Sequence, residues 1–266
     1  KVNQIISENP QQHKEAGFDW GYPSRFATIF DLAKEFGFVY FKINERIEFS
    51  ELGNILVDIL KVQVNDNNEI SVSFENAERE QSVFLQSLAR SQRNNPFVKV
   101  LNDNIPLLLF LQTIRLINAD KDCGKGTGIT RKEIPLLLFW KDNNASELYS
   151  RIKKLRADYG FTPSDEVIID ICINEIMGGK FKKFDTQSIM VDYVDEFIRK
   201  MRMSGLISLR GAGRFVDINH IEDKKVEYIL NNYSDYEHFE DEHSYFEYMS
   251  KIDNNLISLQ AERISD

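Results

Sequence analysis

The 266-residue sequence contains only two cysteines, Cys123 and Cys172. Two thiols are too few for a disulfide framework or a structural zinc site, so we expect a reducing, cytoplasmic compartment. No apolar run approaches the ~18 residues of a membrane-spanning helix, and no signal peptide is recognisable. The chain opens at Lys1 without a methionine, which indicates a trimmed or partial chain. These absences exclude secreted disulfide scaffolds and membrane spans.

The net charge of −9 disfavours nucleic acid as a partner at first sight, but the charge is unevenly distributed. Residues 90–215 carry 21 Lys and Arg against 15 Asp and Glu, a net +6. The remaining residues carry 12 against 27, a net −15. A basic middle between acidic ends favours a central binding surface for an anionic partner.

The most informative stretch is ITRKEIPLLLFWKDNNASELYSRIKKLRADY, residues 129–159, which reads as two helices joined by a tight turn. Thr130 and Glu133 have capping-box spacing, and Pro135 suits a helix start. Residues 141–145 form the turn. In the second helix Leu148, with Ile152, Leu155 and Tyr159, makes an apolar stripe. This pattern predicts a helix-turn-helix, and the alternative is an amphipathic surface helix.

The polar face of the second helix carries four cations within residues 151–156. In a major groove, the helix would bring Asn144, Ser146 and Ser150 near base edges and its cations near phosphates. The loop at residues 119–128 contains Lys125 but lacks the phosphate-loop spacing, so we interpret it as a flexible linker contacting the DNA backbone.

The flanking segments predict winged-helix order. Ser24 and Ser50 are expected to cap helices on either side of two short strands, at residues 38–41 and 46–49. A small α+β hairpin domain without a ligand is the alternative there. Residues 204–218 predict a second hairpin, with Arg210 and Arg214 beside a Gly-Ala-Gly turn, as in a wing that reaches a groove or phosphate.

Helices are also expected at residues 78–93, 104–118 and 225–231. Two more helices are expected to begin at Ser164 and at Ser188, and Val191 in the last of them should face inward. Arg202 near the end of that last helix suits either DNA or the helix dipole.

Catalytic patterns are weak. Asp217 with Glu222, Asp223 and Lys224 is the nearest approach to a metal-dependent nuclease motif, but its spacing is short and no strand is expected there. His238 and His243 lie five residues apart, which misses the spacing of a helical zinc pair. We therefore predict no catalytic and no metal-binding residue in this chain.

Five blocks, in order, carry a family resemblance: GFVYFKINERIEFSELGNIL, VFLQSLARSQRNNPF, NIPLLLFLQTIRLI, GITRKEIPLLLFWKDNN and RKMRMSGLISLRGAG. Across residues 36–250 they resemble the N-terminal recognition region of the AlwI-type (type IIS or nicking) restriction endonucleases. The resemblance implies winged-helix-like subdomains that recognise a short asymmetric DNA site, and a separate C-terminal nuclease domain that uses Mg²⁺. This chain is expected to stop before that domain and to need no cofactor itself.

We therefore predict a mainly α fold with short β-hairpins and helix-turn-helix or winged-helix-like subdomains. A first subdomain with its lead-in is expected at residues 1–100, a second at 101–250, and a linker from 251 to 266. The expected partners are double-stranded DNA, bound by a monomer, and the chain's own nuclease domain. A winged-helix transcription regulator, or another non-nuclease DNA-binding protein, and a helical protein-interaction module are the alternatives. The predicted DNA-binding residues are Lys125, Arg131, Lys132, Asn144, Ser146, Tyr149, Ser150, Arg151, Lys153, Lys154, Arg156, Lys180, Lys182, Lys183, Arg202, Arg210 and Arg214.

Overall fold

The computed structural model describes residues 30–42, 45–66, 70–100, 102–124, 126–180, 185–233 and 236–259. The cap predicted at Ser24 and the cations Lys125, Lys182 and Lys183 lie outside the described residues. Residues 30–35 are helical, and Gly37 follows with a φ of +70°. Within the described ranges, no helix is long and apolar enough to cross a membrane.

The N-terminal elements alternate short antiparallel strand pairs with helices. They are β1 (Val39–Tyr40), β2 (Glu48–Phe49), α3 (Glu51–Asp58), β3 (Leu60–Val64), β4 (Ile70–Phe74) and α4 (Ala77–Arg90). Strand β1 pairs with β2, and β3 pairs with β4. The Ser50 hydroxyl accepts a hydrogen bond from the Gly53 amide at 2.9 Å, which confirms the predicted cap of α3.

The β3–β4 hairpin corrects the sequence prediction, in which residue 60 ended the preceding helix and the strands were missed. Leu60 stands opposite Phe74, and Val62 stands opposite Val72. Apolar residues therefore alternate with polar ones along both strands, which is the period of a strand and not of a helix.

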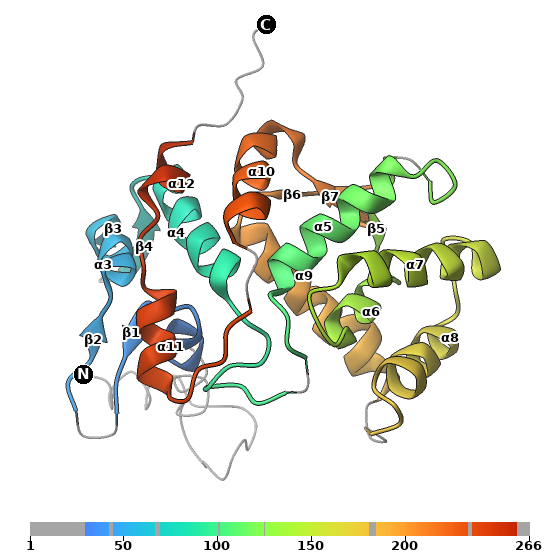
Figure 1. Cartoon of the computed structure of the whole chain (residues 1–266). Helices are drawn as coiled ribbons and strands as arrows, with labels where there is room; N and C mark the ends of the chain where they lie inside the picture. The colour runs from blue at the N-terminus through green and yellow to red at the C-terminus, as the bar shows by residue number, and fades with distance from the viewer. Residues whose placement is uncertain are drawn as a thin grey trace, which may run out of the picture.

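The remaining elements follow in chain order (Figure 1). They are α5 (Pro106–Ala119), β5 (Ile129–Thr130), α6 (Ile134–Phe139), α7 (Ala145–Tyr159), α8 (Asp165–Asp170), the π-helical turns η1 (Ile171–Ile176) and η2 (Ser188–Asp192), α9 (Tyr193–Met203), β6 (Ile207–Arg210), β7 (Phe215–Ile218), the 3-10 turn η3 (His220–Glu222), α10 (Asp223–Asn232), α11 (Glu242–Met249) and α12 (Asn254–Ser258). Strands β5, β7 and β6 form an antiparallel sheet in that order. The fold is thus mainly helical with short antiparallel strand pairs, as predicted.

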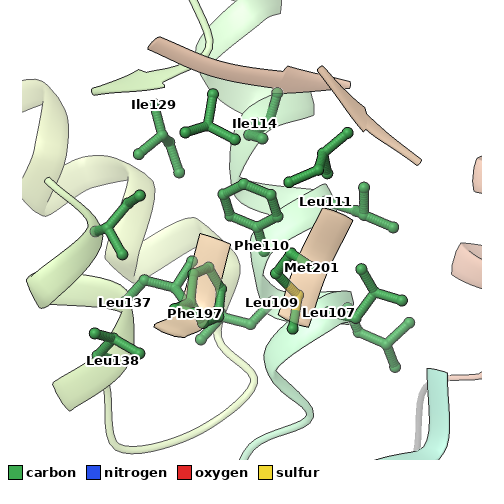
Figure 2. Packing of buried hydrophobic residues seen from close by; sticks show 14 of the residues in the cluster. Leu107, Leu109, Phe110, Leu111, Ile114, Ile129, Leu137, Leu138, Phe197 and Met201 are labelled. Atoms are coloured by element: carbon green, nitrogen blue, oxygen red, sulfur yellow. The ribbon is translucent and has the colours of Figure 1, made fainter. Parts of the chain in front are cut away.

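The core is built on α5, which is buried along most of its length. Phe110 of α5 meets Phe197 of α9 edge to face, with ring centroids 5.5 Å apart (Figure 2). Every residue of α6 is buried, from Ile134 to Phe139. Full burial of an aliphatic or aromatic side chain contributes roughly 1.5–3 kcal/mol, so α6 is a core element whose side chains are unavailable to a partner.

The C-terminal helices return to the N-terminal elements. Figure 1 shows α11 and α12 beside α4 and β1, and both helices contact α4. Leu256 of α12 is buried, and the Asp253 amide donates to the Gln86 side chain of α4 at 2.6 Å. Residues 251–259 are therefore packed against the fold, although they were predicted as the start of a linker. The division at residue 100 stays a prediction.

Candidate nucleic-acid interface

Helices α6 and α7 occupy the two segments that the sequence predicted as a helix-turn-helix, and that arrangement stays a prediction. Pro135 lies in the first turn of α6, where it needs no hydrogen-bond partner for its nitrogen. The Thr130 amide donates to the Glu133 carboxylate at 2.8 Å, which is one half of the predicted capping box. The Thr130 hydroxyl, expected to supply the other half, is buried without a partner. Asn144 caps α7 by accepting from the Glu147 amide at 3.1 Å.

Helix α7 is amphipathic, with Leu148, Ile152 and Leu155 fully buried. Tyr159 was predicted to continue this stripe, but it is 51% exposed because it ends the helix beyond the core. Val191, in the turn before α9, was expected inside and is 38% exposed. The face of α7 opposite the buried stripe therefore belongs to polar residues.

Several predicted DNA-binding cations form ion pairs on the protein surface. The pairs are Arg131 with Asp195, Lys132 with Asp165, Arg151 with Glu175 (2.8 Å), Lys153 with Asp120 (2.6 Å) and Arg210 with Asp217. The basic face is thus partly neutralised. Apart from Arg210 with the buried Asp217, these pairs are partly or fully exposed and contribute only about 0–1 kcal/mol, so a phosphate can compete with the carboxylate for the cation.

Asp120, which follows the last residue of α5, lies against the polar face of α7. It accepts hydrogen bonds from Lys153 and Tyr149, and a third from the Asp122 amide at 2.9 Å. These contacts lower the pKa of Asp120 to about 2. The hydrogen bond to Asp120 also raises the pKa of Lys153, so this lysine stays charged. Tyr149, predicted to face DNA, is held sideways against this carboxylate.

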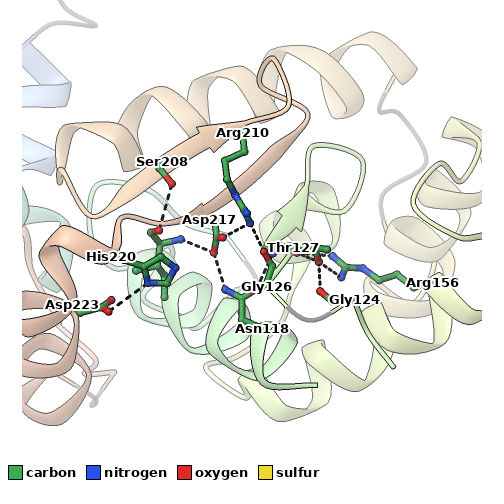
Figure 3. Close-up of polar contacts among 12 residues, drawn as sticks. Asn118, Gly124, Gly126, Thr127, Arg156, Ser208, Arg210, Asp217, His220 and Asp223 are labelled. Atoms are coloured by element: carbon green, nitrogen blue, oxygen red, sulfur yellow. Dashed lines mark hydrogen bonds and ion pairs between the residues drawn. The ribbon is translucent and has the colours of Figure 1, made fainter. Parts of the chain in front are cut away.

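Arg156 was predicted to contact DNA, and the structure contradicts this. Its side chain is only 4% exposed and pairs with Glu133, which is fully buried, at 2.6 and 2.7 Å. It also donates to the Thr127 hydroxyl at 3.1 Å and to the carbonyl groups of Gly128, at 2.7 Å, and Cys123 (Figure 3). Burial alone would lower the pKa of Arg156, but the hydrogen bonds that Arg156 donates to Glu133 raise it. Arg156 therefore fixes α7 to the 123–128 loop.

The same contacts show that this loop is held in place, whereas the sequence predicted a flexible linker. The Gly128 amide donates to the Asn118 side chain at 2.8 Å. Arg210 of β6 donates to the Gly126 carbonyl group and to Asp217, which also accepts from Asn118 at 2.8 Å. Figure 3 shows these groups converging beneath the hairpin. The loop thereby joins α5, α7 and the three-stranded sheet.

The predicted wing is the β6–β7 hairpin, which turns through residues 211–214. Arg214 at its tip is exposed, and the Arg214 carbonyl group accepts from the Arg131 amide at 2.9 Å. Phe215 lies against Phe161, just beyond the end of α7, with ring centroids 6.0 Å apart. The hairpin tip and the C-terminal end of α7 are therefore neighbours.

Four predicted cations remain available to a partner. Lys154, Lys180, Arg202 and Arg214 are exposed, and none forms an ion pair with another residue that the structure describes. Ser146 and Ser150 on α7 are exposed as well, and the Ser150 hydroxyl donates to the Ser146 carbonyl group at 2.8 Å. Lys154, Ser146 and Ser150 lie on α7 with Arg151 and Lys153, and together with Arg214 at the hairpin tip they are named here the α7–wing surface; Lys180 and Arg202 lie on other elements.

The acidic residues nearest to a nuclease motif are engaged elsewhere. The Asp217 side chain is 4% exposed and is bound by Arg210 and Asn118. Glu222 pairs with Lys225 at 2.8 Å, and Asp223 faces His220 at 3.4 Å. Among the described residues, no three His, Cys, Asp or Glu side chains are grouped as a metal would require. These residues do not fit the Mg²⁺ that the resemblance implies, and we assign no Mg²⁺ site to them.

Sequence reasoning missed Glu133 and Asn118 as the residues that hold the interface together. One signal was present for the pair of Arg156 with Glu133. Arg156 follows Ile152 by four residues and Leu148 by eight, so it continues a buried row of the helix. A charge in such a row requires a buried partner. No local pattern identifies Glu133 as that partner, 23 residues away.

The described part of the chain thus combines the helices α6 and α7, a three-stranded antiparallel sheet and exposed cations. The model of the AlwI restriction endonuclease family matches residues 34–266, and the chain belongs to this family. A search of curated proteins finds no match. Among solved structures, the chain is similar to the BpuJ1 endonuclease binding domain, crystallised with pyrene- and phenanthrene-modified DNA. The identity is 16% and the TM-score 0.44, over 82% of this chain and 72% of that one.

Proposed function

We propose that this chain recognises a specific site in double-stranded DNA as the targeting region of a type IIS or nicking restriction endonuclease. The observation that carries the proposal is the family match over residues 34–266, which includes both the predicted helix-turn-helix and the hairpin. The match favours a restriction enzyme over a transcription regulator, the rival from the sequence.

The α7–wing surface and the exposed cations Lys180 and Arg202 support this function by their chemistry. Lys154, Lys180 and Arg202 are suited to phosphates, because they are exposed cations without a competing acidic partner among the described residues. Ser146 and Ser150 are suited to base edges, and Arg214 reaches a neighbouring groove as the tip of a winged-helix hairpin. The chain binds as a monomer, since one asymmetric site needs one reading surface.

Hydrolysis, in this proposal, belongs to a nuclease domain of the same enzyme that binds Mg²⁺ and is distinct from the residues described here. The engagement of Asp217 by Arg210 and Asn118 supports this division, because a carboxylate held by a cation is poorly placed to bind a metal ion. Incubation of the chain with plasmid and Mg²⁺ tests it. Cleavage that Asp217→Asn abolishes would overturn it.

The binding proposal is tested by fluorescence anisotropy on a duplex pool, followed by selection of the bound sequences. Three phosphate contacts, made by Lys154, Lys180 and Arg202, give a slope of log affinity against log salt of about −2.7. Changing these three residues together to glutamine should flatten the slope toward zero. An affinity that is independent of salt, or a bound pool without an enriched sequence, would contradict the proposal.

Lys61→Gln is the matched control for these variants. Lys61 is also a half-exposed cation, but it lies on the β3–β4 hairpin and pairs with Glu75 at 2.7 Å. Its removal takes away one positive charge at a distant element, as each single substitution among those cations does. The salt slope should therefore stay at its wild-type value, and an equal loss in the control would mean that the surface position of the cations is unimportant.

A further inference from the structure

One face of the β3–β4 hairpin is apolar and exposed. Directly opposed residues of an antiparallel pair share a face, so the alternate residues of the two strands form one apolar row. The row consists of Leu60, Val62, Val64, Val72 and Phe74, each of which is between 37% and 62% exposed. Single exposed apolar residues are common on proteins, whereas a contiguous row is typical of an interaction surface.

The outer edge of β4 is open to a further strand. Strand β4 pairs with β3 on one side, and no strand in the described ranges pairs with its other side. The Glu75 amide donates to the Ile59 carbonyl group at 2.9 Å, one residue beyond the last pair of the ladder. Bonded and non-bonded pairs alternate along an antiparallel ladder, so Ser73 directs its backbone groups toward β3. Phe74 and Val72 therefore direct their N–H and C=O groups toward the open edge.

Strand β4 also lacks the residues that usually protect an edge strand. Natural edge strands carry charged side chains, proline or a bulge, which prevent pairing with another chain. The sequence of β4 is ISVSF, with no charge and no proline. Strand β3, by contrast, carries Lys61, which pairs with Glu75 at 2.7 Å. Of the two edges of the hairpin, β4 is therefore the one suited to pairing.

A second copy of this chain matches β4 by symmetry. Val72 is the central residue of the strand, so antiparallel pairing about a two-fold axis places it opposite Val72 of the second copy. The outward N–H and C=O groups of the two valines then exchange two hydrogen bonds. Ser71 lies opposite Ser73 of the second copy, so no like charges meet within the paired strands. An axis perpendicular to the sheet keeps both apolar rows on the same face.

We propose that two copies of this chain associate through β4 and form a four-stranded antiparallel sheet. A contact made by one five-residue strand is small, and interfaces below about 1,200 Å² are typical of weak association. The dimer should therefore form at high protein concentration and dissociate on dilution. Figure 1 shows the hairpin and α7 on opposite sides of the molecule, so each copy keeps its α7–wing surface and one copy still reads one site. The association requires no DNA and does not depend on the function proposed above.

Sedimentation equilibrium of the whole chain over a wide range of concentration tests the association. The wild type should rise from 31.0 kDa toward twice that mass. Val72→Lys places two like charges opposite each other at the axis and should raise the dissociation constant at least tenfold. Val72→Pro should do the same, because it removes the outward N–H and leaves the bonds to β3 in place. Val72→Lys should melt as the wild type does, since Val72 is exposed.

Val62→Lys is the matched control. Val62 lies opposite Val72 on the same apolar face and is similarly exposed, at 57% against 59%. It belongs to β3, however, which is the outer strand of the proposed sheet and meets no residue of the second copy. Val62→Lys should therefore associate as the wild type does. Equal loss of association in Val62→Lys and Val72→Lys would show that the apolar faces stack on each other, and would overturn pairing through the β4 edge.

Two other results would overturn the proposal. The first is a wild type that stays at 31.0 kDa up to the highest concentration at which it is soluble. The second is association of Val72→Lys and Val72→Pro with the wild-type dissociation constant. DNA binding is measured separately by anisotropy, where the wild type and Val72→Lys should bind a duplex equally. If neither binds DNA while the wild type still dimerises, the proposed function is refuted and the β4 interface stands.

Discussion

Replacing Glu133 by glutamine tests whether the buried ion pair holds α7 in place. Glu133 is fully buried, and its carboxylate accepts two hydrogen bonds from Arg156 and one from the Thr130 amide. Glutamine keeps the shape but removes the charge and turns an NH₂ group toward one of these donors. Arg156 is then left as an uncompensated cation at 4% exposure.

Loss of one partner of a buried pair costs about 3–5 kcal/mol. For a chain of this size each kcal/mol corresponds to ~2–4 °C in melting temperature, so Glu133→Gln should melt roughly 6–20 °C lower. The double variant Glu133→Leu with Arg156→Met removes both charges together. Because apolar replacement of a whole buried pair is often neutral or stabilising, it should melt within a few degrees of the wild type.

Urea denaturation of the wild type, of Glu133→Leu, of Arg156→Met and of the double variant completes the cycle. The coupling between the two positions should exceed ~1 kcal/mol, which is the sign of direct contact. Additive effects, or a Glu133→Gln variant as stable as wild type, would refute the argument that Arg156 is a structural residue of the interior. Arg156 would then be free to meet DNA, as its sequence position first indicated.

Four further predictions concern Asp120, Gly128 and Cys172. Asp120→Asn should raise DNA affinity and steepen the salt slope by about 0.9, because Lys153 is released to bind a phosphate. A slope that anisotropy finds unchanged would show that Lys153 does not contact DNA. The pKa of Asp120 is lowered to about 2, so its contribution to stability is present above pH 4 and is lost as the pH falls toward 2. Acid titration of the wild type should show this loss of stability, and acid titration of Asp120→Asn should not. Gly128→Ala should lower stability, seen as a lower melting temperature, because the glycine has a φ of +70° and an added Cβ would lie 2.3 Å from the Val216 carbonyl oxygen. Cys172 should resist thiol reagents at pH 8 until the protein unfolds, because burial raises its pKa to about 12, and rapid labelling of the native protein would contradict this.

Local sequence signals predicted much of the fold. The caps at Ser50 and Ser164, the helical period of α7 and the hairpin at residues 207–218 each depend on residues within one or two turns. The β3–β4 hairpin was missed because residues 51–60 also suit a helix, and Leu60, the first residue of β3, lies within that range. Where two local patterns compete, tertiary pairing decides.

The candidate interface was less predictable, because its charges are determined by distant partners. Arg131 meets Asp195 across 64 residues, and Arg151 meets Glu175 across 24. A count of cations along the chain cannot include such neutralisation. The sequence therefore predicted the helix that carries the interface but assigned to it more available charge than the structure leaves.

The complete burial of α6 restricts how the target site of this family can diverge. A helix whose six residues all lie in the core cannot exchange side chains to suit a new site without loss of stability. Substitution costs little stability only where side chains already face solvent, as at Ser146 and Ser150 of α7 and at Arg214. Under the proposed function, a library for altered specificity would therefore randomise those positions and keep α6 and Arg156 unchanged.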